Sequence, residues 1–261
     1  MAFTIDQFRL DGKVAIVTGA GGRGNSIGRA YALGFALAGA SVVVADLNLE
    51  GAQAVADEIV DAGGTAVAVQ VDVADQDSTL AMAQAAVDAF GGIDILINNA
   101  AMMAELGQLT IADVPLDTWN KILSVNLTGA MLCAQAVIPA MRERGGGRIL
   151  NQTSGGAFPA TSIYGIGKLA LVGLTTTIAK QLGKEGITCN AIAPGNVKSD
   201  AGKLLVPDDS PFIQYLQMNC ATRPRGEPDE LVGTALLLCS EAGAWITGQT
   251  IHIDGGWVMR P

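Results

Sequence analysis

The sequence predicts an α/β fold, in which a single doubly wound sheet of about seven parallel strands carries helices on both faces. Short β-branched apolar runs recur along the chain, helix-length stretches lie between them, and a glycine-rich turn joins the first run to the first helix. Strands and helices that alternate in this way are typical of parallel βαβ units with right-handed crossovers. Because no linker, charge block or low-complexity tract interrupts the pattern, we expect one domain over residues 1–261.

The expected strands are short and bounded by Gly, Asp or Asn, as strands buried on both faces should be. In chain order they are 14–18, 41–45, 66–71, 94–98, 148–152, 188–193 and 250–253.

Helices are expected between the strands. Residues 27–39 and 48–63 have the required length, and Asn48 is expected to cap the second. Two further helices, 118–143 and 165–183, are apolar around most of their circumference. A helix on a sheet needs only one apolar stripe, so these two indicate a second packing partner. The favoured partner is another subunit, in a homotetramer or homodimer, and cover by the chain's own loops is the alternative.

The composition excludes several classes of protein. Apolar residues make up 49% of the chain and charged residues 16%, a combination that disordered chains do not show. The formal net charge of -9 repels nucleic acid and anionic membranes, so neither is an expected partner. The first residues lack the pattern of a signal peptide, and no run of about 18 apolar residues is present. We therefore expect a soluble, cytoplasmic protein.

Neither a metal site nor a disulfide is expected. Cys133, Cys189, Cys220 and Cys239 lie far apart in the sequence, and His252 is the only histidine. Zinc normally needs clustered Cys and His ligands, and a Ser-His-Asp site would depend on His252 alone. Free, buried thiols are expected instead.

A phosphate-binding turn is expected after the first strand. Residues 18–28, TGAGGRGNSIG, lead directly into a helix, whose N-terminus and Cβ-free backbone would let a phosphate approach unpaired N–H groups. Asp46 ends the second strand, where a carboxylate can bind the adenosine ribose diol of a dinucleotide; a surface-turn aspartate is the alternative. At about 4 Å this carboxylate would repel a 2′-phosphate by several kcal/mol, so NAD is favoured over NADP. Arg23, within the turn, would favour NADP instead.

Tyr164 and Lys168, in the sequence YGIGK, stand four residues apart and share one helix face. A phenol with an ordinary pKa near 10 is a poor proton shuttle at neutral pH. A nearby ammonium and the charge of a cofactor would lower that pKa, so the pair is a candidate acid/base. For Lys168, a solvated helix charge is the alternative.

Five motifs occur in the order and approximate spacing of one known family. They are the TG…G turn, NNAA at 98–101, VNLTG around Asn126, a serine in NQTSGG ahead of YGIGK, and APG at 193–195. With these motifs the chain resembles the classical short-chain dehydrogenase/reductase family over about residues 10–257. The resemblance implies a Rossmann-type fold and oxidoreduction of an alcohol or carbonyl with a nicotinamide cofactor, commonly in tetramers built through the two apolar helices.

The resemblance also implies roles for individual residues. Tyr164 would be the acid/base, and Lys168 would lower its pKa and hold the nicotinamide ribose. Ser154 would hydrogen-bond the substrate oxygen, and Asn126 would anchor a water linking Lys168 to solvent, with a helix cap or kink as its alternative. The implied cofactor-binding residues are Gly19, Arg23, Ser26, Ile27, Asp46, Leu47, Asp72 and Val73 (adenine), Asn99 and Ala100 (adenosine ribose), Tyr164, Lys168, and Pro194, Gly195, Val197 and Ser199 (nicotinamide amide).

The sequence departs from the family's pattern in two loops. The glycine turn has three extra residues, with Ser26 just ahead of the helix. The interval from Ser154 to Tyr164 is about three residues shorter than usual, which makes Thr153 and Asn151 alternatives to Ser154.

The main functional hypothesis is a dehydrogenase that transfers a hydride between NAD and a secondary alcohol or ketone, with an apolar small molecule as substrate. The intact Tyr164–Lys168 pair argues against a non-catalytic dinucleotide sensor or scaffold, and the lack of a sizeable C-terminal domain argues against an epimerase or dehydratase. Residues 200–222 are expected to form the loop that sets the substrate. The side chains expected to overhang the site, with core packing as the alternative, are Met102, Met103, Phe158, Ile163, Phe212, Tyr215 and Leu216.

Overall fold

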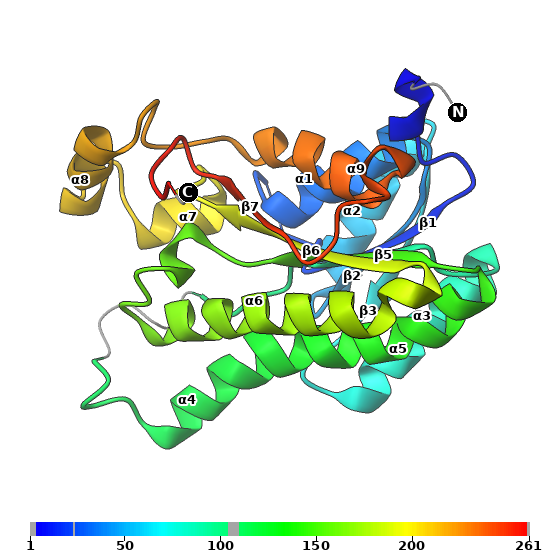
Figure 1. The fold of residues 1–261 in the computed structure, drawn as a ribbon, viewed down its shortest axis with the longest axis horizontal. Coiled ribbons are helices and arrows are strands. Elements are labelled where there is room, and N and C mark those ends of the chain that lie inside the picture. The colour runs from blue at the N-terminus through cyan, green and yellow to red at the C-terminus, as the bar shows by residue number, and fades with distance from the viewer. Residues whose placement is uncertain (1–3, 23, 104–109, 260–261) are drawn as a thin grey trace.

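A parallel sheet of seven strands forms the centre of the computed structural model, which describes residues 4–22, 24–103 and 110–259 (Figure 1). The strand order is β3-β2-β1-β4-β5-β6-β7, and every neighbouring pair is parallel. The strands are β1 Val14–Thr18, β2 Ser41–Asp46, β3 Thr65–Gln70, β4 Ile95–Asn98, β5 Gly147–Gln152, β6 Ile187–Pro194 and β7 Thr250–Ile253. The predicted fold class is confirmed, and each strand lies within one residue of its expected bounds.

Helices cover both faces of the sheet (Figure 1). One face carries α1 Ile27–Leu37, α2 Leu49–Asp61 and α9 Val232–Cys239, and the other carries α3 Gln76–Phe90, α5 Gly129–Glu143 and α6 Ile163–Leu182. The remaining helices are α4 Leu116–Leu123, α7 Asp200–Leu205 and α8 Pro211–Asn219. As expected, Asn48 caps α2, because its side-chain oxygen accepts a hydrogen bond from the Gly51 N–H at 3.3 Å.

The helix expected over 118–143 is interrupted. A π-helical turn, Ser124–Thr128, separates α4 from α5. The combined stretch, Leu116–Glu143, is long and apolar enough to cross a membrane by length and composition alone. In the structure, however, Cys133, Val137 and Met141 of α5 are fully buried in the apolar core on the face of the sheet that α3, α5 and α6 cover. Its composition therefore fits a core helix.

Residues 200–222, expected as a loop, contain α7 and α8. Each helix begins at a serine whose hydroxyl oxygen accepts a hydrogen bond from a backbone N–H three residues later. Ser199 caps α7 through Gly202 at 3.0 Å, and Ser210 caps α8 through Ile213 at 3.3 Å. With these caps the segment forms two short helices, which its sequence did not predict because it lacks helical periodicity.

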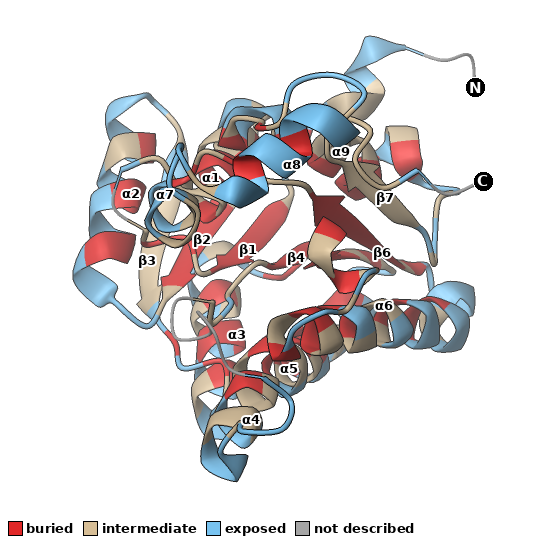
Figure 2. Ribbon diagram, turned by 90° about the vertical axis from the view of Figure 1, so that its left-hand side faces the viewer, coloured by how far each residue is buried: buried red, intermediate tan, exposed pale blue. Residues whose placement is uncertain are grey.

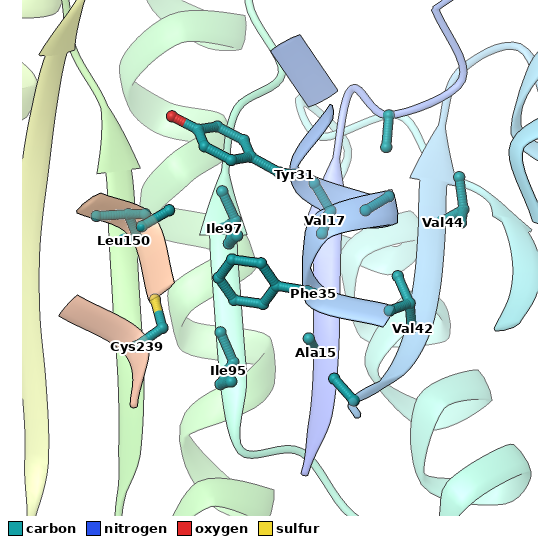
Figure 3. Close-up of a cluster of buried hydrophobic side chains, with 14 of the residues drawn as sticks. Ala15, Val17, Tyr31, Phe35, Val42, Val44, Ile95, Ile97, Leu150 and Cys239 are labelled. Carbon is teal, nitrogen blue, oxygen red and sulfur yellow. The ribbon is translucent and has the colours of Figure 1, made fainter. Parts of the chain in front are cut away.

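Two buried apolar clusters, one on each face of the sheet, form the core. Figure 2 shows the buried sheet between two layers of helices whose outer surfaces are exposed. In the cluster on the α1 face, Tyr31 and Phe35 pack against Val17, Ile97 and Leu150 (Figure 3). This packing fixes α1, and with it the turn before α1, against the carboxyl ends of the strands.

All four cysteines are free thiols. Cys133, Cys189 and Cys239 are buried, as expected, and burial raises the pKa of Cys133 and of Cys239 to about 12. Cys220 differs from the expectation because it is only half-buried. Among the described residues, no group of three or more His, Cys, Asp or Glu side chains could hold a metal ion.

Candidate active site

The strand order reverses direction between β1 and β4, and doubly wound folds bind ligands at the carboxyl ends of strands at such a point. Asn99, just after β4, closes this edge: its Nδ2 donates to the carbonyls of Thr18 and Gly19, each at 2.9 Å. The Thr18 hydroxyl in turn accepts hydrogen bonds from the backbone N–H groups of Asn99 and Ala100. Asn99 and Ala100 therefore hold the start of the glycine turn in place.

The glycine turn has the close approach that a dinucleotide needs. Gly19 adopts φ +65°, and a Cβ there would lie 2.7 Å from the Ala100 Cα. Gly28, in the first turn of α1, packs directly on the Gly19 carbonyl. Ser26 caps α1, with its hydroxyl accepting a hydrogen bond from the Arg29 N–H, and Ile27 is the first helical residue. The residues present thus fit a pyrophosphate at the helix N-terminus.

Asp46 lies at the end of β2 and faces the same turn. Its carboxylate accepts hydrogen bonds from the Gly21 N–H at 2.8 Å and the Asn48 N–H at 2.9 Å. These bonds fix the carboxylate where a ribose diol is expected, and they argue against a mere surface-turn role. Leu47 beside it is 65% exposed. Arg23, which the sequence suggested as a competing 2′-phosphate ligand, lies outside the described residues.

The predicted adenine contacts follow β3. Asp72 is exposed and accepts a hydrogen bond from the Ala74 N–H at 2.9 Å. Val73 is buried and packs close to Gly129 at the start of α5. The turn therefore has one polar and one apolar side, as an adenine site requires.

Tyr164 lies in the first turn of α6, which Ser162 caps through the Gly165 N–H. Ser154, two residues after the end of β5, lines the same cavity as Tyr164, so the two side chains lie close together at the carboxyl edge of the sheet. Burial raises the pKa of Tyr164 to about 12, and the nearby Ser154 side chain offsets only part of this rise. In this state the phenol is a proton donor, in contrast to the lowered pKa that the sequence led us to expect with a cofactor bound.

Lys168 lies one turn further along α6 and is 1% exposed. Its Nζ donates a hydrogen bond to the Gln152 carbonyl at 2.7 Å and lies 5.7 Å from the centre of the Tyr164 ring. Burial lowers the pKa of Lys168 to about 8, so the ammonium is mostly charged at neutral pH. This burial excludes the solvated helix charge considered for Lys168.

The hydrogen bonds distinguish Ser154 from Thr153 and Asn151, the two alternative candidates for hydrogen-bonding the substrate oxygen. Asn151 is fully buried and holds the core: its Nδ2 donates to the Thr175 hydroxyl at 2.9 Å. The Thr153 hydroxyl donates to the Lys168 carbonyl at 2.6 Å, so its proton is not free to hydrogen-bond a substrate. The Ser154 oxygen accepts a hydrogen bond from the Gly156 N–H at 3.1 Å. Its own O–H therefore remains available to donate to another acceptor.

Asn126 is buried in the π-helical turn between α4 and α5. Its Oδ1 accepts from the Met102 N–H at 2.7 Å, and its Nδ2 donates to the Met102 carbonyl at 3.0 Å. The side chain thus fastens the segment after NNAA to the irregular helix. The water-anchoring role of Asn126 stays a prediction.

A cavity of about 140 Å³ lies between the catalytic candidates and the segment after β6. It brings Tyr164 and Ser154 together with Pro194, Gly195, Val197 and Ser199 of the predicted nicotinamide segment. Its full lining is Ile27, Met103, Gln152, Thr153, Ser154, Tyr164, Pro194, Gly195, Asn196, Val197, Ser199, Gly202, Leu205 and Val206. A larger cavity of about 350 Å³ shares Asn196 and Val197 but contains none of the catalytic candidates.

The predicted apolar wall is only partly in place. Met103 lines the cavity, whereas Ile163 and Leu216 are buried core residues. Phe212 and Tyr215 of α8 stack on each other at 6.1 Å and are more than a third exposed. Leu205 and Val206, at the end of α7, also line the cavity. They belong to the segment 200–222 that was expected to set the substrate, although neither was named individually as part of the wall.

Sequence reasoning also missed two contacts that position α7. The extra residue Asn25 donates its N–H to Asp200 Oδ2 and accepts the Asp200 N–H, both at 2.9 Å, and its Nδ2 donates to the Lys198 carbonyl at 2.9 Å. We call this set the Asn25–Asp200 strap. At the other end of α7, the 4% exposed Arg225 donates to the Asn196 side chain at 2.8 Å and to the Val206 carbonyl at 2.6 Å.

Comparisons with known proteins agree with this geometry. A family model described as enoyl-(acyl carrier protein) reductase matches residues 22–258. An uncharacterized oxidoreductase of Mycobacterium tuberculosis is 46% identical over 251 residues, which cover 96% of this chain and 99% of that protein. A solved 7α-hydroxysteroid dehydrogenase, complexed with NADH and 7-oxo glycochenodeoxycholic acid, has a TM-score of 0.89 and 36% identity over 99% of both chains. A gluconate 5-dehydrogenase from Burkholderia cenocepacia, in complex with NADP and tartrate, has a TM-score of 0.89 and 35% identity over 97% of both chains.

Proposed function

The chain belongs to the classical short-chain dehydrogenase/reductase family, and from this premise we propose that it transfers a hydride between NAD and an apolar secondary alcohol or ketone. That the chain is an oxidoreductase of the CH–OH group with a nicotinamide cofactor follows from its relatives. The observation that carries the proposal is the meeting of Tyr164, Ser154 and the predicted nicotinamide segment around one cavity, with the Lys168 ammonium buried behind Tyr164.

The side chains divide the chemistry among them. The nicotinamide, when bound, accepts or supplies the hydride. In the reducing direction the Tyr164 phenol donates its proton to the carbonyl oxygen of the substrate, and the Ser154 hydroxyl hydrogen-bonds the same oxygen. The buried Lys168 ammonium stabilises the phenolate that forms, because opposite charges attract more strongly where water is excluded.

Asp46 supports the preference for NAD. Its carboxylate is fixed by two backbone N–H groups at the end of β2, where the ribose is expected. At a separation of about 4 Å and an effective dielectric near 20, each charge on a 2′-phosphate would be repelled by about 4 kcal/mol. Related structures hold NADH in one case and NADP in another. The preference for NAD in this chain therefore has to be argued from its own residues.

The lining of the cavity supports an apolar substrate. Ile27, Met103, Leu205 and Val206 present apolar side chains around the predicted catalytic pair. One similar structure holds a steroid, and another is named for a sugar acid. The lining includes the amides of Gln152 and Asn196, but in the described part of the chain it has no charged side chain to pair with the carboxylate of a sugar acid. We therefore propose a cyclic or steroid-like alcohol as the substrate class.

We also propose that copies of this chain assemble into a tetramer or dimer through α5 and α6. Helix α6 leaves Leu169 41% exposed and Gly173 open to solvent, which suits close contact with a second helix. The cytoplasmic location expected from the sequence stays a prediction.

A screen of secondary alcohols tests the function. Purified protein is incubated with NAD or NADP and a panel that includes steroid, terpenoid, simple cyclic and polyol substrates, and the reduced cofactor is followed by absorbance. We expect turnover with NAD and an apolar cyclic alcohol, and turnover lowered by about 10² to 10⁴ in the Tyr164→Phe variant. Tight NADH binding without turnover on any alcohol or ketone would favour the sensor alternative.

A further inference from the structure

Gln152 is the last residue of β5 and lies directly before the candidates Thr153 and Ser154. It is 8% exposed and lines the same cavity as Ser154 and Tyr164. A polar side chain so deeply buried needs hydrogen-bond partners, because an unsatisfied amide costs free energy.

Two of the polar groups of Gln152 are already used. Its backbone carbonyl accepts the Lys168 Nζ at 2.7 Å, and its side-chain Oε1 accepts the Tyr31 hydroxyl at 2.7 Å. Tyr31 reaches Gln152 from α1, and its hydroxyl points away from the apolar cluster, as Figure 3 shows. Burial raises the pKa of Tyr31, so its phenol stays protonated and acts as the donor.

The bond from Tyr31 fixes which end of the Gln152 amide remains free. With Oε1 held by Tyr31, the Nε2 group is left with two N–H donors. In the part of the chain that the structure describes, no hydrogen bond from Nε2 is found, while the residue borders the cavity. The Tyr31–Gln152 pair thus orients the Nε2 group of Gln152 as a hydrogen-bond donor for a ligand in the cavity.

We propose that Gln152, oriented by Tyr31, is a further ligand-binding residue that donates a hydrogen bond from Nε2 to an oxygen of the nicotinamide half of the dinucleotide. The assignment to that half rests on the proposed function. Gln152 pairs with Ile192 on β6, two residues before Pro194, so it lies beside the predicted nicotinamide segment. The adenosine half is expected at Asp46, on the other side of β1 in the sheet.

Equilibrium binding of NADH and of AMP tests the proposal without reference to turnover. Gln152→Met keeps the length of the side chain but removes its donors. Because this change leaves the Tyr31 hydroxyl buried without a partner, the double variant Tyr31→Phe/Gln152→Met is measured as well; replacing both partners by apolar groups avoids that penalty. Thermal unfolding confirms that each variant is folded.

We expect both variants to bind NADH about tenfold more weakly than the wild type, with AMP affinity unchanged, because one hydrogen bond to the nicotinamide half is lost. A double variant that binds NADH as tightly as the wild type would show that the Tyr31–Gln152 pair serves the fold alone. A parallel loss of AMP affinity would overturn the assignment to the nicotinamide half. A wild type that binds AMP but not NADH would overturn the proposed function together with this inference.

Discussion

Burial of the Lys168 ammonium should make the stability of this protein depend on pH in a way that Lys168→Met removes. The folded state lowers the pKa of this lysine from 10.5 to about 8, because the side chain is taken out of water. Between these two pH values the unfolded chain binds more protons than the folded one. Stability therefore rises with pH across this window, and the contribution is unfavourable at and below neutral pH.

The magnitude follows from the shift. At 1.36 kcal/mol per pKa unit, the buried charge costs roughly 3 kcal/mol at low pH. About 2 kcal/mol of this cost disappears between pH 7 and pH 9.5, as the folded lysine loses its proton before the unfolded one. The side chain is 1% exposed, so solvent does not screen the effect. The Met variant also loses the hydrogen bond from Lys168 to the Gln152 carbonyl, which lowers its stability at every pH tested.

Urea unfolding of both proteins at pH 7, 8 and 9.5, at one protein concentration, measures the effect. Buried cysteines and Tyr164, whose pKa values are raised, lower stability at the alkaline end, but they are present in both proteins and cancel in the difference. Lys180→Met is the matched control, because Lys180 is exposed on the same helix. The wild type should gain about 2 kcal/mol relative to Lys168→Met over this range, and a difference that stays flat would refute the reasoning.

Three further predictions concern the site and the assembly. Tyr164→Phe should lower kcat by about 10² to 10⁴ while NADH affinity, measured by fluorescence titration, stays within a few-fold; near-normal turnover would show that another group moves the proton. Asp46→Ser should improve NADPH binding relative to NADH by at least about tenfold, and unchanged relative affinities in the same titration would leave the preference to Arg23. Sedimentation at micromolar concentration should give a mass of two or four times 26.7 kDa, and a monomer would contradict the role given to α5 and α6.

The sheet could be predicted from the sequence because its inner strands are buried on both faces. A run such as VAIVT at 14–18 is buried throughout and apolar up to its last residue, so its ends coincide with polar or glycine residues. The order of motifs placed Tyr164, Ser154 and Asp46 near one edge for the same reason, since parallel strands end together.

Other features depend on contacts between distant parts of the chain. The π-helical turn at Asn126 is stabilised by a residue 24 positions away, Met102, so periodicity over 118–143 could not reveal it. The Tyr31–Gln152 bond spans 121 positions, and two polar residues in otherwise apolar segments gave no sign that they meet. Helices α7 and α8 are short and depend on capping serines, which is why the segment was expected to be a loop.

The Asn25–Asp200 strap bears on how this enzyme can be modified. Loops that set substrate choice are usually treated as exchangeable parts of a rigid scaffold. Here the segment that enters α7 forms hydrogen bonds with Asn25, and Asp200 fills the space beside Gly24. A segment transplanted from a relative with the shorter glycine turn would lose these partners, so the two must be exchanged together as one hydrogen-bonded unit.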